Sequence, residues 1–272
     1  MRRLLLSPFF ILLLNSCTDS SPNSGSKASV STPSTPVINY AVTNYFAHDT
    51  SLFTEGFLFH NGQLFESTGS PKQLPQTRSV IGITDLATGK FDVKIEIDKS
   101  KYFGEGIVFF KNKLYQLTYV NRIGFIYDAK TFKEIGQFNY SNIEGWGLTT
   151  DGTSLIMSDG TSNLTYLDPV KLTPLKTLQV TEQGYPIEKL NELEFIKGFL
   201  YANIWTSDII VKIDPLSGNV VGKMDLSSLT NEAKRINPNA DVLNGIAYDS
   251  TTDKIYVTGK LWPNIYQIQF SH

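Results

Sequence analysis

Short apolar stretches separated by polar turns fill most of this chain of 272 residues. Within residues 102–119, apolar and polar positions alternate on both sides of a Lys-Asn-Lys corner, which predicts two antiparallel strands joined by a tight turn. The same outline returns four more times, at intervals of roughly 40 to 53 residues. Repeats of this length indicate a fold built from copies of one supersecondary unit.

An acidic or amide side chain opens the first strand of every repeat. These column residues are Glu55, Glu105, Glu144, Asn191 and Asn244. A third strand, often ending in aspartate, and a fourth strand follow each hairpin. Four strands in each of five repeats predict an all-β domain, a five-bladed β-propeller with four-stranded antiparallel blades.

The last repeat lacks an apolar stretch for its fourth strand. Residues 37–46 precede the first repeat, and we expect them to supply that outer strand, which closes the ring and removes an open edge. The column residues then surround the central channel near one face. The strand rhythm breaks at residues 185–190 and 227–242, with a short helix expected over 226–235, and we expect these insertions to cover a ligand site.

Residues 1–17 have the pattern of a targeting segment. Arg2 and Arg3 precede an apolar run over residues 4–14 that is too short to span a bilayer, and Cys17, the single cysteine, follows. This pattern resembles a bacterial lipoprotein signal with Cys17 as the lipidated residue; the alternative is an ordinary secretory signal. Residues 18–36 then form a flexible tether rich in Ser, Thr and Pro, and residues 37–272 the catalytic propeller. The expected location is the cell envelope, on its periplasmic side or surface, with membrane contact only through the lipid.

Composition and the remaining motifs narrow the chemistry. The net charge of −2 argues against a nucleic-acid partner, and the three histidines are scattered without metal-ligand spacing. No nucleophile with a usable base and no phosphate-binding glycine loop is present in the sequence. Glutamates, amides, tryptophans and one lysine remain, which favours acid–base chemistry in an aromatic pocket.

Several runs resemble one enzyme family, the plant-type and bacterial glutaminyl-peptide cyclotransferases. The similarity covers residues from about Tyr45 to Phe270, in the family's order. The runs that carry it are Phe103-Gly-Glu-Gly106, Glu144-Gly-Trp-Gly-Leu-Thr-Thr-Asp-Gly152, Leu190-Asn-Glu-Leu-Glu194, Ala202-Asn-Ile-Trp205, Val242-Leu-Asn-Gly-Ile-Ala247 and Val257-Thr-Gly-Lys-Leu-Trp-Pro263. The resemblance implies a monomeric five-bladed propeller acyltransferase. It would convert the N-terminal glutamine of peptides or proteins to pyroglutamate and release ammonia, with no cofactor and no catalytic zinc.

The resemblance also implies roles for individual residues. Glu105 is the acid–base carboxylate and Lys260 the catalytic lysine. The substrate-binding set is Trp146 and Trp205 as pocket walls, Asn191 as a polar contact, and Glu55, Glu144, Tyr119 and Asn244. Two positions depart from the plant proteins, which have glutamine where Glu55 stands and tryptophan where Tyr119 stands.

The reaction can also be argued from the residues alone. An α-amine that attacks its own side-chain amide closes a five-membered ring, so the substrate supplies the proximity. One carboxylate can then take a proton from the amine and return it to the leaving nitrogen. Burial of Glu105 between two indoles would raise its pKa and a nearby Lys260 would lower it, and the sequence leaves the balance open. Lys260 or Asn191 would face the developing oxyanion.

Purely structural roles for these residues and two other classes of protein are the alternatives to this hypothesis. Glu105 could join neighbouring blades, the two pocket tryptophans could be inter-blade core, and Trp262 is expected to be core. The oxygen ligands of Glu55, Glu105, Asn191 and Asn244 would suit calcium, as in lactonase-like propeller hydrolases, which a chelator would inactivate. The third reading is a non-catalytic binding propeller, since a fold alone implies no chemistry.

Overall fold

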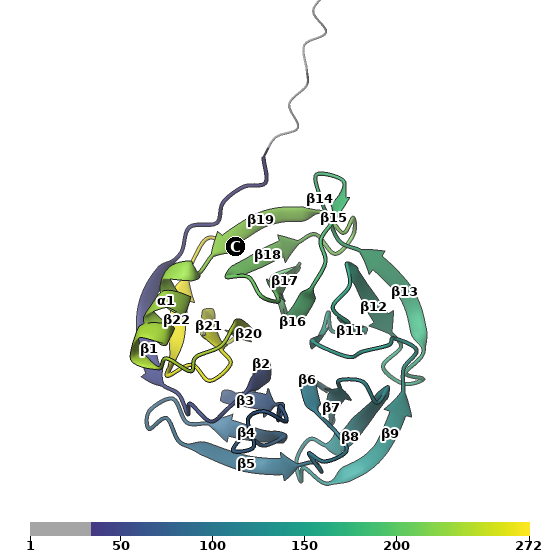
Figure 1. The fold of residues 1–272 in the computed structure, drawn as a ribbon. Coiled ribbons are helices and arrows are strands. Elements are labelled where there is room, and N and C mark those ends of the chain that lie inside the picture. The colour runs from purple at the N-terminus through teal and green to yellow at the C-terminus, as the bar shows by residue number, and fades with distance from the viewer. Residues whose placement is uncertain (1–33) are drawn as a thin grey trace, which may run out of the picture. The chain divides into compact units, whose positions relative to one another are not determined.

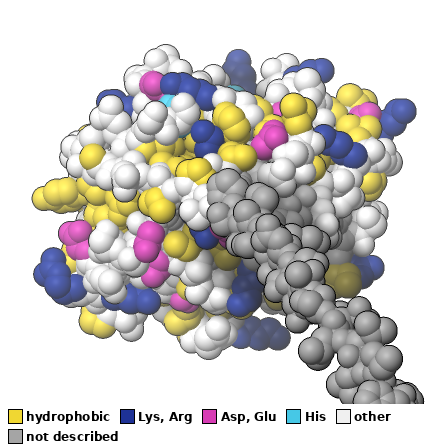
Figure 2. Space-filling model, turned by 90° about the horizontal axis from the view of Figure 1, so that it is seen from above, with side chains coloured by type: hydrophobic (Ala, Val, Ile, Leu, Met, Phe, Trp, Pro, Cys, Tyr) yellow, Lys and Arg dark blue, Asp and Glu magenta, His cyan; other side chains and the backbone are white. Residues whose placement is uncertain are grey.

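Five four-stranded antiparallel sheets surround a common centre in the computed structural model, which describes residues 34–272 (Figure 1). This confirms the predicted five-bladed β-propeller. Cys17 and the predicted signal and tether up to residue 33 lie outside the described residues. Between residues 34 and 272, no helix is long and apolar enough to cross a bilayer. Basic and acidic side chains are interspersed over the surface seen in Figure 2.

Each blade is a meander that runs outward from the channel. The strands of the first three blades are β2 (Thr54–His60), β3 (Gln63–Thr68), β4 (Val80–Thr84) and β5 (Phe91–Glu96); β6 (Gly104–Phe110), β7 (Lys113–Thr118), β8 (Ile123–Asp128) and β9 (Glu134–Asn139); and β10 (Leu148–Thr150), β11 (Leu155–Met157), β12 (Asn163–Leu167) and β13 (Pro174–Gln179). The last two blades are β16 (Leu190–Ile196), β17 (Phe199–Ile204), β18 (Ile209–Ile213) and β19 (Val220–Asp225); and β20 (Leu243–Asp249), β21 (Lys254–Gly259), β22 (Asn264–Gln269) and β1 (Ala41–Ala47).

The N-terminal strand closes the ring. β1 pairs antiparallel with β22, from Ala41 opposite Gln269 to Ala47 opposite Asn264. Just before it, the chain runs beside β19 of the fourth blade, where Ile38 N donates to Lys223 O. β1 therefore supplies the outer strand of the last blade, as predicted for residues 37–46, and the residues just before it also bond to the fourth blade.

Backbones of the innermost strands come into close contact. A Cβ on Gly106 would lie 2.5 Å from Trp146 O, and one on Gly147 would overlap Asn191 O. Glycine is required at such positions because a side chain would push the blades apart. These contacts pair each glycine with the column residue of the next blade, which in the third blade is Trp146. In the third blade the column position is therefore taken by Trp146, and not by the predicted Glu144, which lies two residues earlier in the sequence.

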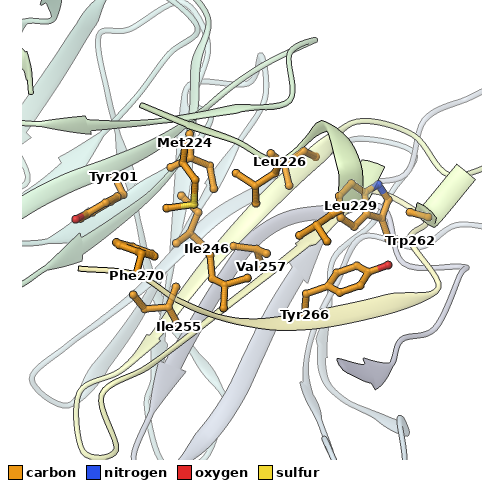
Figure 3. Packing of buried hydrophobic residues seen from close by; sticks show 14 of the residues in the cluster. Tyr201, Met224, Leu226, Leu229, Ile246, Ile255, Val257, Trp262, Tyr266 and Phe270 are labelled. Atoms are coloured by element: carbon orange, nitrogen blue, oxygen red, sulfur yellow. The ribbon is translucent and has the colours of Figure 1, made fainter. Parts of the chain in front are cut away.

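Hydrophobic clusters fill the spaces between blades. The largest lies between the last two blades and includes Tyr201, Met224 and Trp262, which is fully buried (Figure 3). α1 (Ser227–Ile236), which matches the short helix predicted over 226–235, covers this cluster with Leu229 and Ala233. Burying a large apolar side chain contributes roughly 1.5 to 3 kcal/mol, so the expected core role of Trp262 is confirmed as a stabilising one.

The two insertions lie in different places. β14 (Thr181–Glu182) and β15 (Tyr185–Pro186) form a small hairpin at the outer rim (Figure 1), where Thr181 N donates to Gly218 O. This hairpin contributes no residue to the pocket described below. Further along the predicted insertion at 185–190, Lys189 Nζ lies 5.5 Å from the centre of the Trp205 ring, which lines that pocket. The segment after α1 does line that pocket.

The buried His48 links the end of β1, the strand that closes the ring, to the loop that carries Lys260. His48 Nε2 lies 3.0 Å from the Glu66 carboxylate, and His48 Nδ1 lies 2.8 Å from Trp262 O. Both ring nitrogens face oxygen atoms that can accept a hydrogen bond, an arrangement that favours the imidazolium form. Burial lowers the pKa of His48, but the Glu66 carboxylate outweighs it and the net pKa is raised.

Candidate active site

A cavity of about 460 Å³ opens near the starts of the innermost strands. It brings together seven of the nine predicted site residues: Glu55, Glu105, Tyr119, Trp146, Asn191, Trp205 and Lys260. The other two, Glu144 and Asn244, lie directly behind this lining. Residues more than 200 positions apart in sequence therefore meet in one pocket because the ring closes between the first and last blades.

Glu55 and Lys260 form a buried ion pair. Lys260 Nζ lies 2.6 Å from Glu55 Oε1, and the two residues are only 6% and 2% exposed. Lys260 Nζ also lies 4.6 Å from the centre of the Phe53 ring, a cation–π contact. From behind, Asn244 Nδ2 donates to Thr54 O at 3.0 Å and reaches Glu55 Oε2 at 3.4 Å. The pairing fixes the carboxylate of Glu55 in place.

Glu105 hydrogen-bonds to Glu55 and is 4% exposed. Burial raises the pKa of Glu105 well above its usual value, the negative charge of Glu55 raises it further, and Lys260 opposes both. Burial also raises the pKa of Glu55, with the ammonium of Lys260 lowering it. Since Lys260 bonds directly to Glu55, its ammonium opposes the effect of burial more closely at Glu55 than at Glu105. At Glu105, burial and the Glu55 charge outweigh the Lys260 ammonium, and the net pKa is raised well above its usual value.

Aromatic side chains form the walls of the pocket. The Trp146 and Trp205 rings lie 5.5 Å apart at 80°, and Phe103 packs against Tyr119 at 6.0 Å. Gly160 has a φ of +78° and packs closely against Trp146. A Cβ at this position would lie only 2.6 Å from the indole, so a larger residue would displace the ring. The walls can hold an aliphatic chain and exclude water from the carboxylates.

Glu144 positions two of these walls. Its Oε2 accepts a hydrogen bond of 2.8 Å from Trp146 Nε1, and its carboxylate also accepts from the Tyr119 hydroxyl. Burial raises the pKa of Tyr119, and the Glu144 charge adds to that effect. Glu144 therefore acts here through the aromatic residues it holds.

Asn191 presents a polar group to the cavity. Its side-chain oxygen is buried and has no hydrogen-bond partner among residues 34–272. A buried acceptor without a partner costs about 1 to 3 kcal/mol, so a ligand that donates a hydrogen bond there recovers that energy. Asn191 is thus suited to bind an N–H group.

Seven lining residues were not predicted: Phe53, Pro71, Gln73, Phe103, Thr206, Asp241 and Val242. The sequence did contain a signal for the two phenylalanines. Phe53 and Phe103 each stand two residues before a column glutamate, and positions i and i+2 share one face of a strand. Gln73 and Asp241 lie in irregular segments, where no periodicity relates a position to a face.

Two of the side chains considered as calcium ligands already bond to other groups of the protein. Lys260 bonds to Glu55, and Asn244 donates its amide to Thr54 O. Within residues 34–272, no three His, Cys, Asp or Glu side chains gather in a metal-binding arrangement. An ammonium at the carboxylate repels a cation, so this donor set disfavours the calcium reading.

Two further carboxylates, the buried Glu192 and the half-buried Glu194, join blades. Glu192, from β16, accepts hydrogen bonds from Ile246 N at 2.8 Å and Phe57 N at 3.4 Å. Burial raises the pKa of Glu192 well above its usual value and that of Glu194 to about 8. Glu192 and Glu194 thus join blades, as Glu105 also does through its contact with Glu55.

The raised pKa values predict a stability that falls with rising pH. A group whose pKa is higher in the folded chain stabilises it below the unfolded value, about 4.5 for glutamate, and loses that contribution as pH rises through the folded value. Glu55, Glu105, Glu192, Glu194 and His48 all act in this direction. We expect the thermal midpoint to decrease between about pH 5.5 and pH 8.5. A calorimetric series that shows a flat or rising midpoint over this range would contradict these pKa shifts.

Fold and pocket together define a β-propeller with an acid–base site of paired carboxylates and aromatic walls. The family model of glutamine cyclotransferases matches residues 12–270. A glutaminyl-peptide cyclotransferase from Arabidopsis thaliana is 40% identical over 226 residues, or 82% of this chain and 69% of that protein. The crystal structure of a glutaminyl cyclase from Myxococcus xanthus matches with a TM-score of 0.77 and 34% identity, over 87% of this chain and 98% of that chain. The chain belongs to the glutamine cyclotransferase family, which confirms the resemblance and the prediction of a transferase.

Proposed function

We propose that this protein converts the N-terminal glutamine of peptides to pyroglutamate and releases ammonia. Two similar proteins carry the names glutaminyl-peptide cyclotransferase and glutaminyl cyclase. The observation that carries the proposal is the buried Glu105 carboxyl group, whose pKa is raised well above its usual value beside the Glu55–Lys260 ion pair in an aromatic pocket. Such a group can donate and accept a proton near neutral pH.

Glu105 alone can make both proton transfers that the reaction requires. An ionised Glu105 with a substrate ammonium and a protonated Glu105 with a neutral amine hold the same number of protons. From the second state, the amine nitrogen attacks the side-chain carbonyl carbon and a C–N bond forms. Glu105 gives its proton to the leaving amide nitrogen and takes one from the attacking nitrogen, so ammonia leaves and the enzyme is unchanged.

Lys260 and Asn191 surround this exchange. The Lys260 ammonium has three N–H donors, of which one bonds to Glu55, so others can face the oxyanion. The oxygen of Asn191 is suited to accept a hydrogen bond from the substrate amine or amide. The indoles of Trp146 and Trp205 would enclose the glutamine methylenes and keep water from the carbonyl, which favours cyclisation over hydrolysis.

Incubation of the purified protein with a glutamine-started peptide tests the proposal. We expect the peptide to lose the mass of one ammonia, and we expect the rate to survive EDTA because the proposed steps require only protein side chains. The same peptide with N-terminal asparagine is the control, since its shorter side chain would close a strained four-membered ring. No mass loss from the glutamine peptide would refute the proposal, and loss of activity on chelation would refute the zinc-free mechanism.

We also propose that the protein acts as a lipid-anchored monomer in the cell envelope. The motif before Cys17 and the tether after it support the anchor. Metabolic labelling with a fatty-acid analogue should mark the full chain and not its Cys17→Ala variant; equal labelling of both would refute the anchor.

A further inference from the structure

A second cavity of about 610 Å³ adjoins the active-site pocket and shares Gln73 and Asp241 with it. One wall is the loop between β3 and β4, and the other is the segment between α1 and β20. This volume is typical of ligand-binding clefts. We call this second cavity the side groove.

Both walls of the side groove are held in place by internal hydrogen bonds. In the first wall, Thr77 Oγ1 donates to Leu74 O at 2.6 Å, and Lys99 Nζ donates to Pro75 O at 2.8 Å. In the second, Asn237 Nδ2 donates to Leu261 O at 2.8 Å. A groove with fixed walls binds an extended chain without first ordering itself.

The second wall is also continuous with the catalytic lysine. Asp241 N donates to Lys260 O at 2.8 Å, and Lys260 N donates to Val242 O at 3.0 Å. A chain that lies along the side groove is therefore led directly to the reacting centre.

The lining of the side groove suits a peptide backbone. Exposed amide side chains come from Gln73, Gln76 and Asn239, and an amide both donates and accepts hydrogen bonds, as a peptide unit does. Asp241 is the single charged residue of the lining, and it is exposed. A negative charge there attracts a basic side chain and repels an acidic one.

We propose that the side groove binds the residues that follow the N-terminal glutamine, and that Asp241 selects basic over acidic residues among them. This inference rests on the proposed function. The glutamine carries the rest of the peptide on its α-carbonyl carbon, so that chain must leave the pocket, and the boundary at Gln73 and Asp241 opens into a polar, fixed groove.

The test compares substrates of different length and charge on the full-length protein. Glutaminamide fills only the pocket, whereas Gln-Ala-Ala-Ala, Gln-Lys-Ala-Ala and Gln-Glu-Ala-Ala also reach the side groove. In the parent protein we expect the lysine peptide to exceed the glutamate peptide in kcat/KM. Asp241→Asn should reduce this ratio about two- to fivefold, the upper part of the range that an exposed ion pair contributes. Glu134→Gln, on the outer strand β9, is the matched charge control and should leave the ratio unchanged.

A second variant tests the proposal even if Asp241→Asn does not fold. The double variant Gln76→Ala/Asn239→Ala should lower kcat/KM for Gln-Ala-Ala-Ala relative to glutaminamide by about fivefold, through KM. If glutaminamide is cyclised but neither ratio changes in these variants, the side groove proposal is overturned alone. If the parent protein cyclises no substrate, the proposed function falls, and the side groove proposal with it.

Discussion

Glu105→Gln is expected to reduce kcat for a glutamine-started peptide by about three orders of magnitude, with KM nearly unchanged. Glutamine has the shape of a protonated glutamate and can keep the hydrogen bond to Glu55. It cannot exchange a proton with the amine or the leaving nitrogen, and general acid–base catalysis contributes about 10² to 10⁴ in rate. Single-turnover release of ammonia, measured beside peptide binding by calorimetry, separates the two effects.

Glu55→Gln is the matched control for this variant, because it removes the neighbouring carboxylate and leaves the proton carrier. We expect it to slow turnover by no more than about tenfold. It should also lower the pKa of Glu105, since the Lys260 charge then acts on Glu105 without the opposing charge of Glu55. An equal loss of kcat in both variants would show that Glu105 has no special role.

Lys260→Met is expected to cost about 3 to 5 kcal/mol of unfolding free energy, the second large effect. The change leaves the Glu55 carboxylate buried without its cation, next to a second buried acid. The same variant should lower kcat about a hundredfold, because it removes a donor that can face the oxyanion. Urea unfolding and steady-state kinetics measure the two losses.

The double variant Lys260→Met/Glu55→Gln separates charge from packing. With both partners neutral, most of the lost stability should return, while the catalytic loss should remain. Unfolding free energies that simply add in the double variant would contradict a direct Glu55–Lys260 interaction. A single Lys260→Met variant as stable as the parent would contradict it as well.

The blades were predictable because every repeat contains the same hairpin at a regular interval, and because residues 37–46 had no hairpin of their own. The third blade was harder. Glu144-Gly145-Trp146-Gly147 contains two residue–glycine pairs two positions apart, and positions i and i+2 share one face of a strand. Alternation alone cannot choose between them. The contact between Gly147 and Asn191 of the next blade makes the choice.

Pairings across the ring were beyond the sequence for a similar reason. Repeats identified Glu55 as a column residue and the resemblance identified Lys260, but nothing in the sequence joins two residues 205 positions apart. Without that pair, the net shift in the pKa of Glu105 could not be predicted, because burial and Lys260 act in opposite directions. Gln73 and Asp241 lie in irregular segments, so their place at the pocket follows only from the folded chain.

The most direct test of the account is the pKa of the Glu105 carboxyl group. Carbon-13 labelling of glutamate side chains would allow an NMR titration of the folded protein, with Glu105→Gln identifying the resonance. The account predicts that Glu105 titrates well above the usual value of 4.5 and still holds its proton when surface glutamates have lost theirs. Titration of Glu105 at or below 4.5 in the folded protein would contradict the proposed proton carrier.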